Sequence, residues 1–344
     1  MITKIIREEN IEKVKKIIDK NSKFAIVTHI SPDGDAVGAS LGLYNYFSEI
    51  DKDAVVIFND SVSDNLRWMP GIKDSLYYEQ YKQECSDILE NADVIFCLDF
   101  NTPKRMGELS ELVLKSKAIK ILVDHHLYPG DFCQVIISHP EISSASELIF
   151  RLICRMGEYE NINYDCATCI YTGMMTDTGA FTYNSNNPEI YVIISQLLKI
   201  GINKDWIYDQ VNNHFSENRE RLMGYTISQK MRTYPQFKSA IITLNSEELI
   251  RYDYKKGDTE GFVNIPLSIK GIVFSAFFRE DKDYIKISLR SKGDFPANKI
   301  AEMYFNGGGH KNAAGGEYFG SLDEAIARLE EVIPAFNEYF NDKN

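Results

Sequence analysis

One histidine and two aspartates stand close together near the start of the chain, directly after an apolar segment. His29, Asp33 and Asp35 have the spacing H-x3-D-x-D on a turn that contains proline and glycine, and the apolar run Phe24–Thr28 precedes them. Imidazole nitrogen and carboxylate oxygen are atoms that bind divalent metal ions in proteins. The spacing therefore predicts a metal site at the end of a strand.

Three further elements end in acidic or imidazole side chains. Asp99 closes one apolar run, and Asp177 ends a predicted helix. A third run ends in Asp124, His125 and His126. A single aspartate at such a position often only caps the following helix. Burying four ends of this kind together would be prohibitive without cations to neutralise the carboxylates, so we expect these side chains to converge on metal.

The number of candidate ligands indicates two metal ions that share one carboxylate. A mixture of imidazole and carboxylate suits Mn²⁺, with Fe²⁺, Co²⁺ or Zn²⁺ as alternatives and Mg²⁺ as a less natural choice beside histidine. Two cations about 3.5–4 Å apart can activate a bridging water and hold the oxygens of an in-line displacement. The predicted chemistry is hydrolysis of a phosphate ester or anhydride.

The elements that must position these residues alternate between short apolar strands and helices. Such alternation predicts a parallel sheet with helices on both faces, preceded by an amphipathic helix on which Ile11, Val14 and Ile18 recur at helical spacing. In sheets of this kind, ligands gather at the carboxyl ends of the strands. The predicted strands are 24–29, 54–58, 94–99, 119–124 and 134–138, and helices are predicted over 36–48 and 108–114.

The rest of the chain divides into a helical part and a second pattern of strands and helices. Helices are predicted over 143–156, 165–175 and 188–200. The second pattern has strands 239–244, 272–278 and 284–289 and helices 296–304 and 322–340. We therefore expect an α/β protein of two domains. The catalytic domain would span 1–215, with a helical linker at about 186–232, and a smaller α/β domain would span 233–344.

A glycine-rich segment in the second half is a separate candidate binding element. It consists of Gly307, Gly308, Gly309 and His310. Successive glycines let backbone N–H groups point into one concavity that can hold a phosphate, and a flexible turn is the alternative interpretation. Arg290 follows a predicted strand and could pair with a phosphate through two guanidinium N–H groups at once. A solvated charge on an edge strand explains Arg290 nearly as well.

Composition bounds the function further. The 344 residues carry a formal net charge of −12, and 44% of them are hydrophobic. This charge disfavours a protein that coats long nucleic acid, but a small anionic substrate remains compatible because metal ions can reverse the local field. The six cysteines lie scattered in apolar segments, as is typical of reduced thiols. With no signal peptide and no apolar run near the roughly 20 residues of a membrane span, we expect a cytoplasmic protein without a membrane partner.

At these residues the chain resembles the DHH family of phosphoesterases. Asp124, His125 and His126 match the motif that gives the family its name, and the other metal-site motifs follow in the family's order. The segment Gly307–His310 resembles the DHH-associated C-terminal domain. The resemblance spans residues from about 20 to 320, and within the family it is strongest to the NrnA type. Asn306 and Ala39 depart from the family's pattern, which puts substrate preference in doubt more than activity.

The resemblance implies a role for each matching position. His126 would lie toward the scissile phosphate as a donor or proton relay, and Asp124 would orient a ligating histidine. One Mn²⁺ would be held by His29 and Asp33, the second by Asp35, His125 and Asp177, and Asp99 would bridge the two. The implied substrate-binding residues, across a cleft between the domains, are Arg290, Ser291, Gly307, Gly308, Gly309 and His310, with Arg105 as a further candidate.

The likeness also implies an activity. NrnA-type proteins are bifunctional oligoribonucleases and phosphatases, so the chain would release 5′-mononucleotides from short RNA and convert 3′-phosphoadenosine 5′-phosphate (pAp) to AMP with Mn²⁺, which Mg²⁺ or Co²⁺ could replace. Hydrolysis of cyclic or linear dinucleotides, such as c-di-AMP, pApA and pGpG, is the nearest alternative. A RecJ-like exonuclease and an inorganic pyrophosphatase are less favoured. A nucleotide sensor without catalysis is a different class, and a homodimer is left open.

Overall fold

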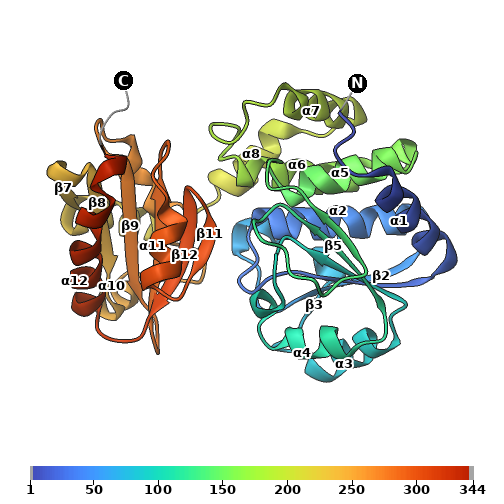
Figure 1. Ribbon diagram of the computed structural model, residues 1–344, viewed down its shortest axis with the longest axis horizontal. Helices are drawn as coiled ribbons and strands as arrows, with labels where there is room; N and C mark the ends of the chain where they lie inside the picture. The colour runs from blue at the N-terminus through green and yellow to red at the C-terminus, as the bar shows by residue number, and fades with distance from the viewer. Residues whose placement is uncertain (1–2, 341–344) are drawn as a thin grey trace. The chain divides into compact units, whose positions relative to one another are not determined.

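The computed structural model describes residues 3–340, which form two compact units divided between His214 and Phe215 (Figure 1). Each unit is built on its own six-stranded sheet and has its own hydrophobic core. Within the described residues, no helix has both the length and the apolar character that a membrane span requires.

The sheet of the first unit is parallel throughout, in the order β3-β2-β1-β4-β5-β6. The strand order reverses between β1 and β4, and ligands bind at such a switch point, beyond the carboxyl ends of the strands. The strands are β1 (Lys23–Val27), β2 (Asp53–Phe58), β3 (Leu76–Tyr77), β4 (Val94–Leu98), β5 (Ile119–Asp124) and β6 (Val135–Ser138).

Helices cover both faces of this sheet because the strands are apolar on both sides. Phe24 and Ile26 of β1 pack on one side with α1, α2, α5 and α6, while Ala25 and Val27 pack on the other side with α3 and α4. The predicted parallel-sheet fold is therefore confirmed. The helices are α1 (Glu8–Lys20), α2 (Gly34–Glu49), α3 (Lys82–Asn91), α4 (Leu109–Lys115), α5 (Ala145–Arg155) and α6 (Tyr164–Asp177).

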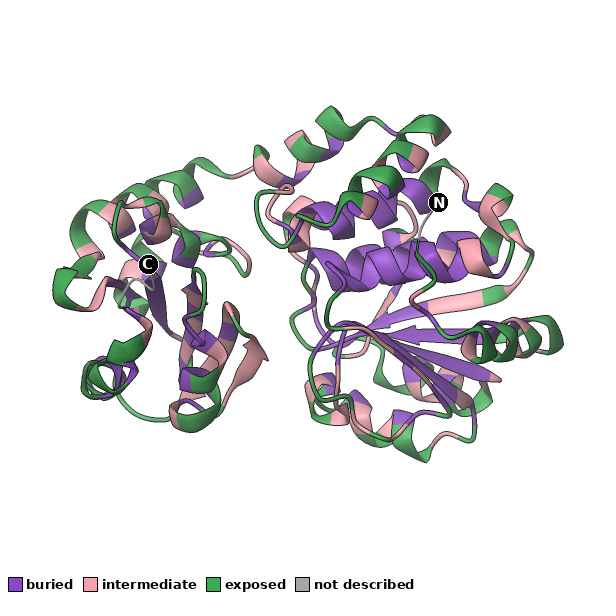
Figure 2. Cartoon of the chain, turned by 45° about the horizontal axis from the view of Figure 1, so that its top comes forward, coloured by how far each residue is buried: buried purple, intermediate pink, exposed green. Residues whose placement is uncertain are grey.

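Helix α2 is buried along most of its length and packs closely against α6 (Figure 2). A Cβ atom on Gly38 would lie 2.7 Å from the backbone of Gly173 in α6. Gly34 and Gly42, one turn before and one turn after, also face α6. Helix axes can approach one another this closely only where the contact residues are small. The close packing brings the first turn of α2 beside the last turn of α6.

Further helices follow where a helical linker was predicted. They are α7 (Pro188–Ile200), α8 (Lys204–Asn212), α9 (Glu217–Tyr225) and a π-helical turn over Thr226–Lys230. Helix α7 has the residues expected at both ends: Asn187 caps its first turn, and Gly201 ends it in a left-handed conformation with φ of 107°.

The second unit contains a mixed sheet in the order β11-β12-β10-β9-β8-β7, in which only β8 and β9 run parallel. Helices α11 (Ala297–Tyr304) and α12 (Leu322–Val332) pack on one face, and α10 (Ser246–Arg251) follows β8. The strands are β7 (Arg232–Tyr234), β8 (Ser239–Leu244), β9 (Phe274–Glu280), β10 (Ile285–Ser291), β11 (Gly308–His310) and β12 (Ala313–Tyr318).

Two predicted features of this unit differ from the structure. The helix expected over 322–340 ends at Val332 and continues as the 3-10 segment Ile333–Tyr339, because Pro334 lacks the N–H that an α-helix needs. The glycine-rich segment was expected to form an open concavity or a flexible turn, but Gly308–His310 is the edge strand β11, paired with β12. Gly307 and Gly309 lie where a Cβ atom would strike the β12 backbone, so their small size permits the pairing.

Candidate functional site

His29 lies just beyond the carboxyl end of β1, at the switch point of the first sheet. Its Nδ1 is 2.8 Å from the carbonyl oxygen of Ile30. A carbonyl can only accept a hydrogen bond, so Nδ1 carries the proton and Nε2 presents a lone pair. Nε2 lies 3.5 Å from Oδ2 of Asp99 and 3.9 Å from Oδ1 of Asp33. The backbone therefore orients this imidazole as a metal ligand.

Asp33 and Asp35 take their positions from the start of α2. Asp33 is the N-cap, and its Oδ1 accepts hydrogen bonds from the N–H groups of Asp35 at 3.1 Å and Ala36 at 3.0 Å. The side chain of Asp33 is 60% exposed, whereas that of Asp35 is 1% exposed. One aspartate of the motif thus faces outward and the other is buried.

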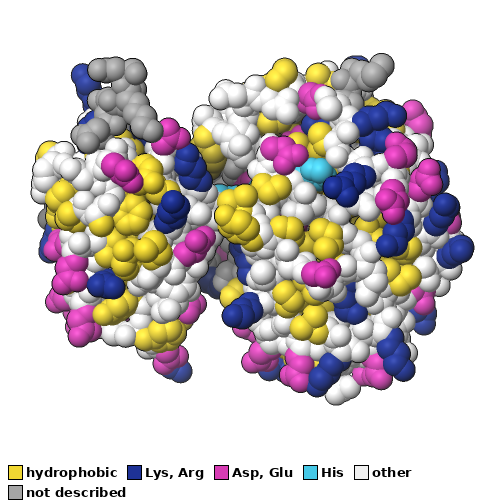
Figure 3. Space-filling view, in the orientation of Figure 1, with side chains coloured by type: hydrophobic (Ala, Val, Ile, Leu, Met, Phe, Trp, Pro, Cys, Tyr) yellow, Lys and Arg dark blue, Asp and Glu magenta, His cyan; other side chains and the backbone are white. Residues whose placement is uncertain are grey.

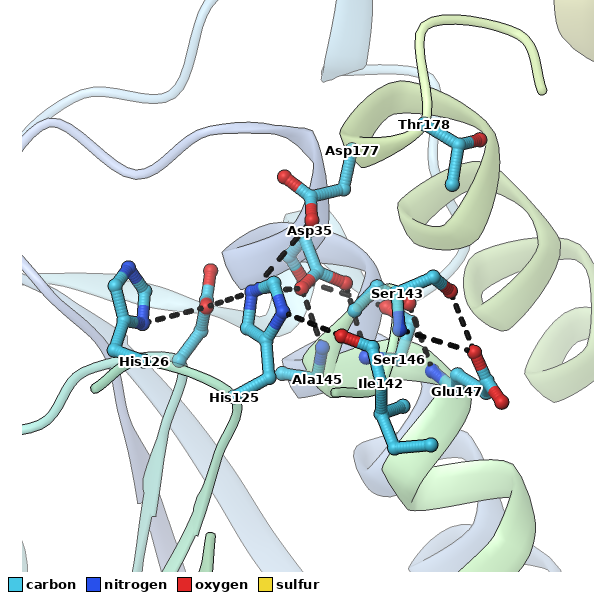
Figure 4. A network of polar contacts seen from close by, with 12 residues as sticks. Asp35, His125, His126, Ile142, Ser143, Ala145, Ser146, Glu147, Asp177 and Thr178 are labelled. Atoms are coloured by element: carbon cyan, nitrogen blue, oxygen red, sulfur yellow. Dashed lines mark hydrogen bonds and ion pairs between the residues drawn. The ribbon is translucent and has the colours of Figure 1, made fainter. Parts of the chain in front are cut away.

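The carboxylate of Asp35 lies at the N-terminus of α5. Oδ2 accepts from the N–H of Ala145 at 2.6 Å, and Oδ1 accepts from the N–H of Ser146 at 2.9 Å (Figure 4). Free N–H groups and the helix dipole both stabilise a negative charge at this position. Two helices distant in sequence therefore fix the orientation of this buried side chain.

His125 follows β5 and is oriented in the same way as His29. Its Nδ1–H donates to the carbonyl oxygen of Ile142 at 3.1 Å, which leaves Nε2 to face three carboxylates (Figure 4). Nε2 lies 3.7 Å from Oδ2 of Asp35, 3.4 Å from Oδ1 of Asp99 and 3.6 Å from Oδ2 of Asp177. Asp177 is the last residue of α6, so the close packing of α2 and α6 completes this group.

Asp99 stands between the two histidines. It follows β4 directly, is 2% exposed and has a left-handed backbone with φ of 61°. Its Oδ2 faces Nε2 of His29, while its Oδ1 faces Nε2 of His125. Among the described residues, Oδ1 accepts no hydrogen bond although it is buried. A buried oxygen without a hydrogen bond, aimed at a lone-pair nitrogen, is unfavourable unless a cation lies between them.

The donor sets fit two divalent cations. His29, Asp33 and Asp99 form one group, and Asp35, His125 and Asp177 form another, with the ligand atoms of each group within 4.8 Å of one another. Two ligands that are each about 2.1 Å from one ion lie roughly 3.0–3.5 Å apart at right or tetrahedral angles. The separations of 3.4–3.7 Å around His125 are close to that range.

The ionisation of the cluster also indicates a need for positive charge. Burial, together with repulsion from Asp99 and Asp177, raises the pKa of Asp35 well above its usual range. Burial alone would also raise the pKa of Asp99, but the close approach of the His125 and His29 imidazoles outweighs it and holds that pKa well below the usual range. Without cations these carboxylates cannot all be ionised comfortably, and bound cations would remove the conflict.

Asp124 and His126 form a separate pair. Nδ1 of His126 lies 2.7 Å from Oδ1 of Asp124, and both side chains are buried. The family resemblance implied that Asp124 orients a ligating histidine. In the structure it holds His126, the proposed proton donor, whereas the carbonyl of Ile142 orients His125. Asp124 is the last residue of β5, and its backbone is still paired with β6. Its side chain contacts that of His126, two residues further along the chain.

Arg105 lies near the first group of ligands. It belongs to the 3-10 turn Pro103–Met106, and its carbonyl oxygen accepts from the N–H of Ile30 at 2.8 Å. This bond ties the loop after β4 to the loop after β1. Burial lowers the pKa of His29, but Asp99 and Asp33 outweigh it and raise that pKa above its usual value, and the charge of Arg105 opposes the rise.

The substrate-binding residues predicted in the second unit divide between two faces of its sheet. Arg290 lies opposite Ala313, which lies opposite His310, so the three form one row across neighbouring strands. Gly308 shares this face, which is turned away from the core under α11 and α12. Ala313, which lies between the arginine and the histidine, is small, and so is Gly315 on the same face.

Ser291 and Gly309 face the opposite side, because successive strand residues alternate. The Ser291 hydroxyl is buried, donates to the carbonyl of Phe295 at 2.7 Å and accepts from the side chain of Asn312 at 2.8 Å. Its hydrogen bonds therefore hold the end of β10 in place.

Several residues that build the site carry no chemical signature in the sequence. The N–H groups of Ala145 and Ser146 and the carbonyl of Ile142 act through the backbone, which any residue possesses. The one visible signal is the four-residue spacing of Gly34, Gly38 and Gly42, which a search for small residues along a helix could have found.

Two protein-family models match the chain, one in each unit. The DHH family, N-terminal domain, matches residues 23–174, and the DHHA1 domain matches residues 239–339. The chain belongs to the DHH family. The match to the first domain includes His29, Asp99 and His125, and the match to the second includes Arg290 and His310.

Several known proteins align along nearly the whole chain. The bifunctional oligoribonuclease and PAP phosphatase NrnA of Thermus thermophilus is 28% identical, over 90% of this chain and 88% of that protein. The cyclic-di-AMP phosphodiesterase GdpP of Bacillus subtilis is 25% identical over 95% of this chain, which is 49% of GdpP. The crystal structure of an exopolyphosphatase-related protein from Bacteroides fragilis is 54% identical, covers 99% of this chain and all of that one (100%), and has a TM-score of 0.95.

Proposed function

We propose that this DHH family member is a metal-dependent phosphoesterase that hydrolyses short oligoribonucleotides to 5′-mononucleotides and removes the 3′-phosphate from pAp to give AMP. One observation carries the proposal: the two oxygens of the buried Asp99 carboxylate face the lone-pair nitrogens of two different histidines. The likeness to NrnA over 90% of the chain supports the choice of substrates.

Six side chains would hold two Mn²⁺ ions, which Mg²⁺ or Co²⁺ could replace. His29 and Asp33 would serve one ion, the group around His125 would serve the other, and Asp99 would be shared. When bound, the two ions would supply a water that ionises near neutral pH and positive charge for the phosphate oxygens. The backbone hydrogen bonds to both histidines keep Nε2 directed at the ions before they arrive.

His126 would move a proton during the reaction. Asp124 accepts from the Nδ1–H of His126, which leaves Nε2 as the atom that can exchange a proton. Nε2 of the imidazolium form would donate a proton to the oxygen that leaves when the phosphoester bond breaks. The pair resembles, in chemical logic, other histidine–aspartate pairs in which the carboxylate fixes the tautomer of the working imidazole.

The row of Arg290, Gly308 and His310 would bind the nucleotide part of the substrate. Arginine offers paired N–H donors that match a phosphate, and in this structure its Nη1 reaches only backbone carbonyls, of Leu289 at 3.0 Å and Ala314 at 3.4 Å. A formal net charge of −12 on the protein disfavours binding of long nucleic acid and is compatible with a short substrate. On the face drawn in Figure 3, basic and acidic side chains are interspersed rather than gathered into one basic area.

Product analysis tests the proposal. The protein, loaded with Mn²⁺, is incubated with end-labelled RNAs of two to about twenty nucleotides, with pAp, and with linear and cyclic dinucleotides. We expect fast release of mononucleotides from the shortest RNAs and of phosphate from pAp, and slow reaction of long RNA. Equal rates at all lengths would contradict the short-substrate proposal. Faster turnover of cyclic dinucleotides than of all the linear substrates would favour the GdpP-like alternative.

A further inference from the structure

We infer that Glu147, which is not a metal ligand, is a positioning residue that fixes the ligands of one of the two metal ions, the one served by His125 and Asp35. The inference rests on the metal centre proposed above. Glu147 lies in the first turn of α5 and is 1% exposed. A buried carboxylate is costly unless hydrogen bonds and an opposite charge compensate it, so its partners indicate its role.

Glu147 holds the loop that enters α5. Its Oε2 accepts from the Ser143 hydroxyl at 2.5 Å and from the Ser143 N–H at 3.3 Å (Figure 4). Ser143 directly follows Ile142, whose carbonyl orients His125. Ser144 caps the helix through the Glu147 N–H at 3.0 Å, immediately before the two N–H groups that bind Asp35. One short segment, 142–146, therefore orients both ligands, and Glu147 anchors it.

Arg151 fixes Glu147 in turn. Its Nε and Nη2 donate to Oε1 of Glu147 at 2.8 and 2.7 Å, and the guanidinium is 2% exposed. Nη2 also lies 2.9 Å from Oε2 of Glu189, at the start of α7. Both charges of the pair are compensated, and Arg151 keeps a carboxylate partner if Glu147 is neutralised. The loop is thus held by a rigid side chain rather than by solvent-exposed contacts.

The other group of ligands does not depend on this segment. His29 is oriented by the carbonyl of Ile30, and Asp33 by the N–H groups of α2. Disturbing Glu147 should therefore weaken one metal site and leave the other unchanged. A residue that merely stabilised the fold would affect both sites alike.

The test is a titration of the full-length protein with Mn²⁺, monitored by electron paramagnetic resonance and by calorimetry. Both methods count bound ions independently of turnover. In Glu147→Gln we expect one site of wild-type affinity and one weakened by about 10–100-fold, the usual effect of losing a group that orients a ligand. Ser143→Ala, which removes only the hydroxyl link, should weaken the same site to a smaller extent. The matched control is Glu141→Gln, which changes an exposed carboxylate directly before this segment and should bind Mn²⁺ as the wild type does.

The outcomes separate this inference from the proposed function. Two wild-type affinities in both Glu147→Gln and Ser143→Ala would overturn the positioning role and leave the metal centre intact. Equal weakening of both sites in Ser143→Ala, whose buried ion pair is preserved, would also overturn it. Failure of the wild-type protein to bind Mn²⁺ would overturn the metal centre and the inference together.

Discussion

At the scale of single residues, Asp99 combines the proposed role of shared metal ligand with an unfavourable backbone conformation. Its left-handed backbone is unfavourable for most side chains, and asparagine and aspartate tolerate it best after glycine. Because both of its oxygens face histidine nitrogens, the side chain must follow β4 at an angle that a regular strand would not give. The strained conformation thus lies where the two ligand groups meet.

The first prediction concerns Asp99→Asn. Asparagine keeps the size and the left-handed backbone but removes the negative charge, so the fold should survive while the shared ligand is lost. We expect turnover of pAp to fall by about a thousandfold or more, with an unchanged circular dichroism spectrum. Asp87→Asn, on the exposed side of α3, is the control and should keep full activity. Full turnover by Asp99→Asn would refute the shared-carboxylate proposal.

A second prediction concerns pH and Glu189. Hydrogen bonds from Thr3, and then from Arg151, lower the pKa of Glu189 to about 2 from an ordinary 4.5. A lowered pKa in the folded state stabilises the protein above the unfolded value, and this stability disappears as pH falls through the folded value. Glu189→Gln should therefore lower Tm by about 2–4 °C at neutral pH. The difference from the wild type should shrink between pH 4.5 and 2, and a difference independent of pH would contradict this account.

At the scale of elements, periodicity predicted most strands and helices of the first unit but not their spatial order. Pro188–Ile200 was predicted with the bounds of α7, because proline and glycine mark its ends. The two-residue strand β3 has too few residues to show a pattern. β11 and β12 were missed because glycine is rare in strands and each of these two strands contains two glycines. The candidate metal ligands could be singled out from the sequence because each stands at an end of an element, whereas the partner of Asp124 depends on side-chain geometry that spacing does not encode.

The third prediction tests the helix pair that positions Asp35 and Asp177. In Gly38→Ala the new methyl group would meet the α6 backbone, which cannot move aside as a side chain could. We expect destabilisation of about 1–3 kcal/mol in urea unfolding and weaker Mn²⁺ binding at the His125 group. Gly224→Ala is the matched control: a helical glycine with open space around it, where alanine should stabilise by up to about 1 kcal/mol. Equal effects of the two substitutions would argue against close helix packing as the cause.

At the scale of the whole molecule, the residues proposed for metal binding and for nucleotide binding lie in two units with separate cores. All six proposed metal ligands belong to Met1–His214, and the row containing Arg290 and His310 belongs to Phe215–Asn344. The first unit buries its own sheet on both faces, so its stability does not depend on the core of the second. Metal binding and nucleotide binding should therefore be separable.

The fourth prediction follows from this division. A fragment of residues 1–214 should fold, bind two Mn²⁺ ions with the affinity of the full chain and hydrolyse a small activated phosphodiester such as bis(p-nitrophenyl) phosphate. Its KM for pAp should rise by at least about tenfold, because Arg290, the residue proposed to pair with phosphate, is absent. Calorimetry and steady-state kinetics provide the measurements. An unchanged KM for pAp in the fragment would place nucleotide binding entirely in the first unit.

The edge strand β11 should also differ from the rest of its sheet in how fast its amide hydrogens exchange. It is three residues long, two of them glycines, and it pairs with a neighbour on one side only. Per residue, such a strand loses more conformational entropy on ordering than the other strands of its sheet, so its amide hydrogens should exchange with deuterium long before those of β9 and β10. A bound nucleotide would slow that exchange at His310. Nucleotide binding could then be followed as a loss of mobility confined to this edge strand.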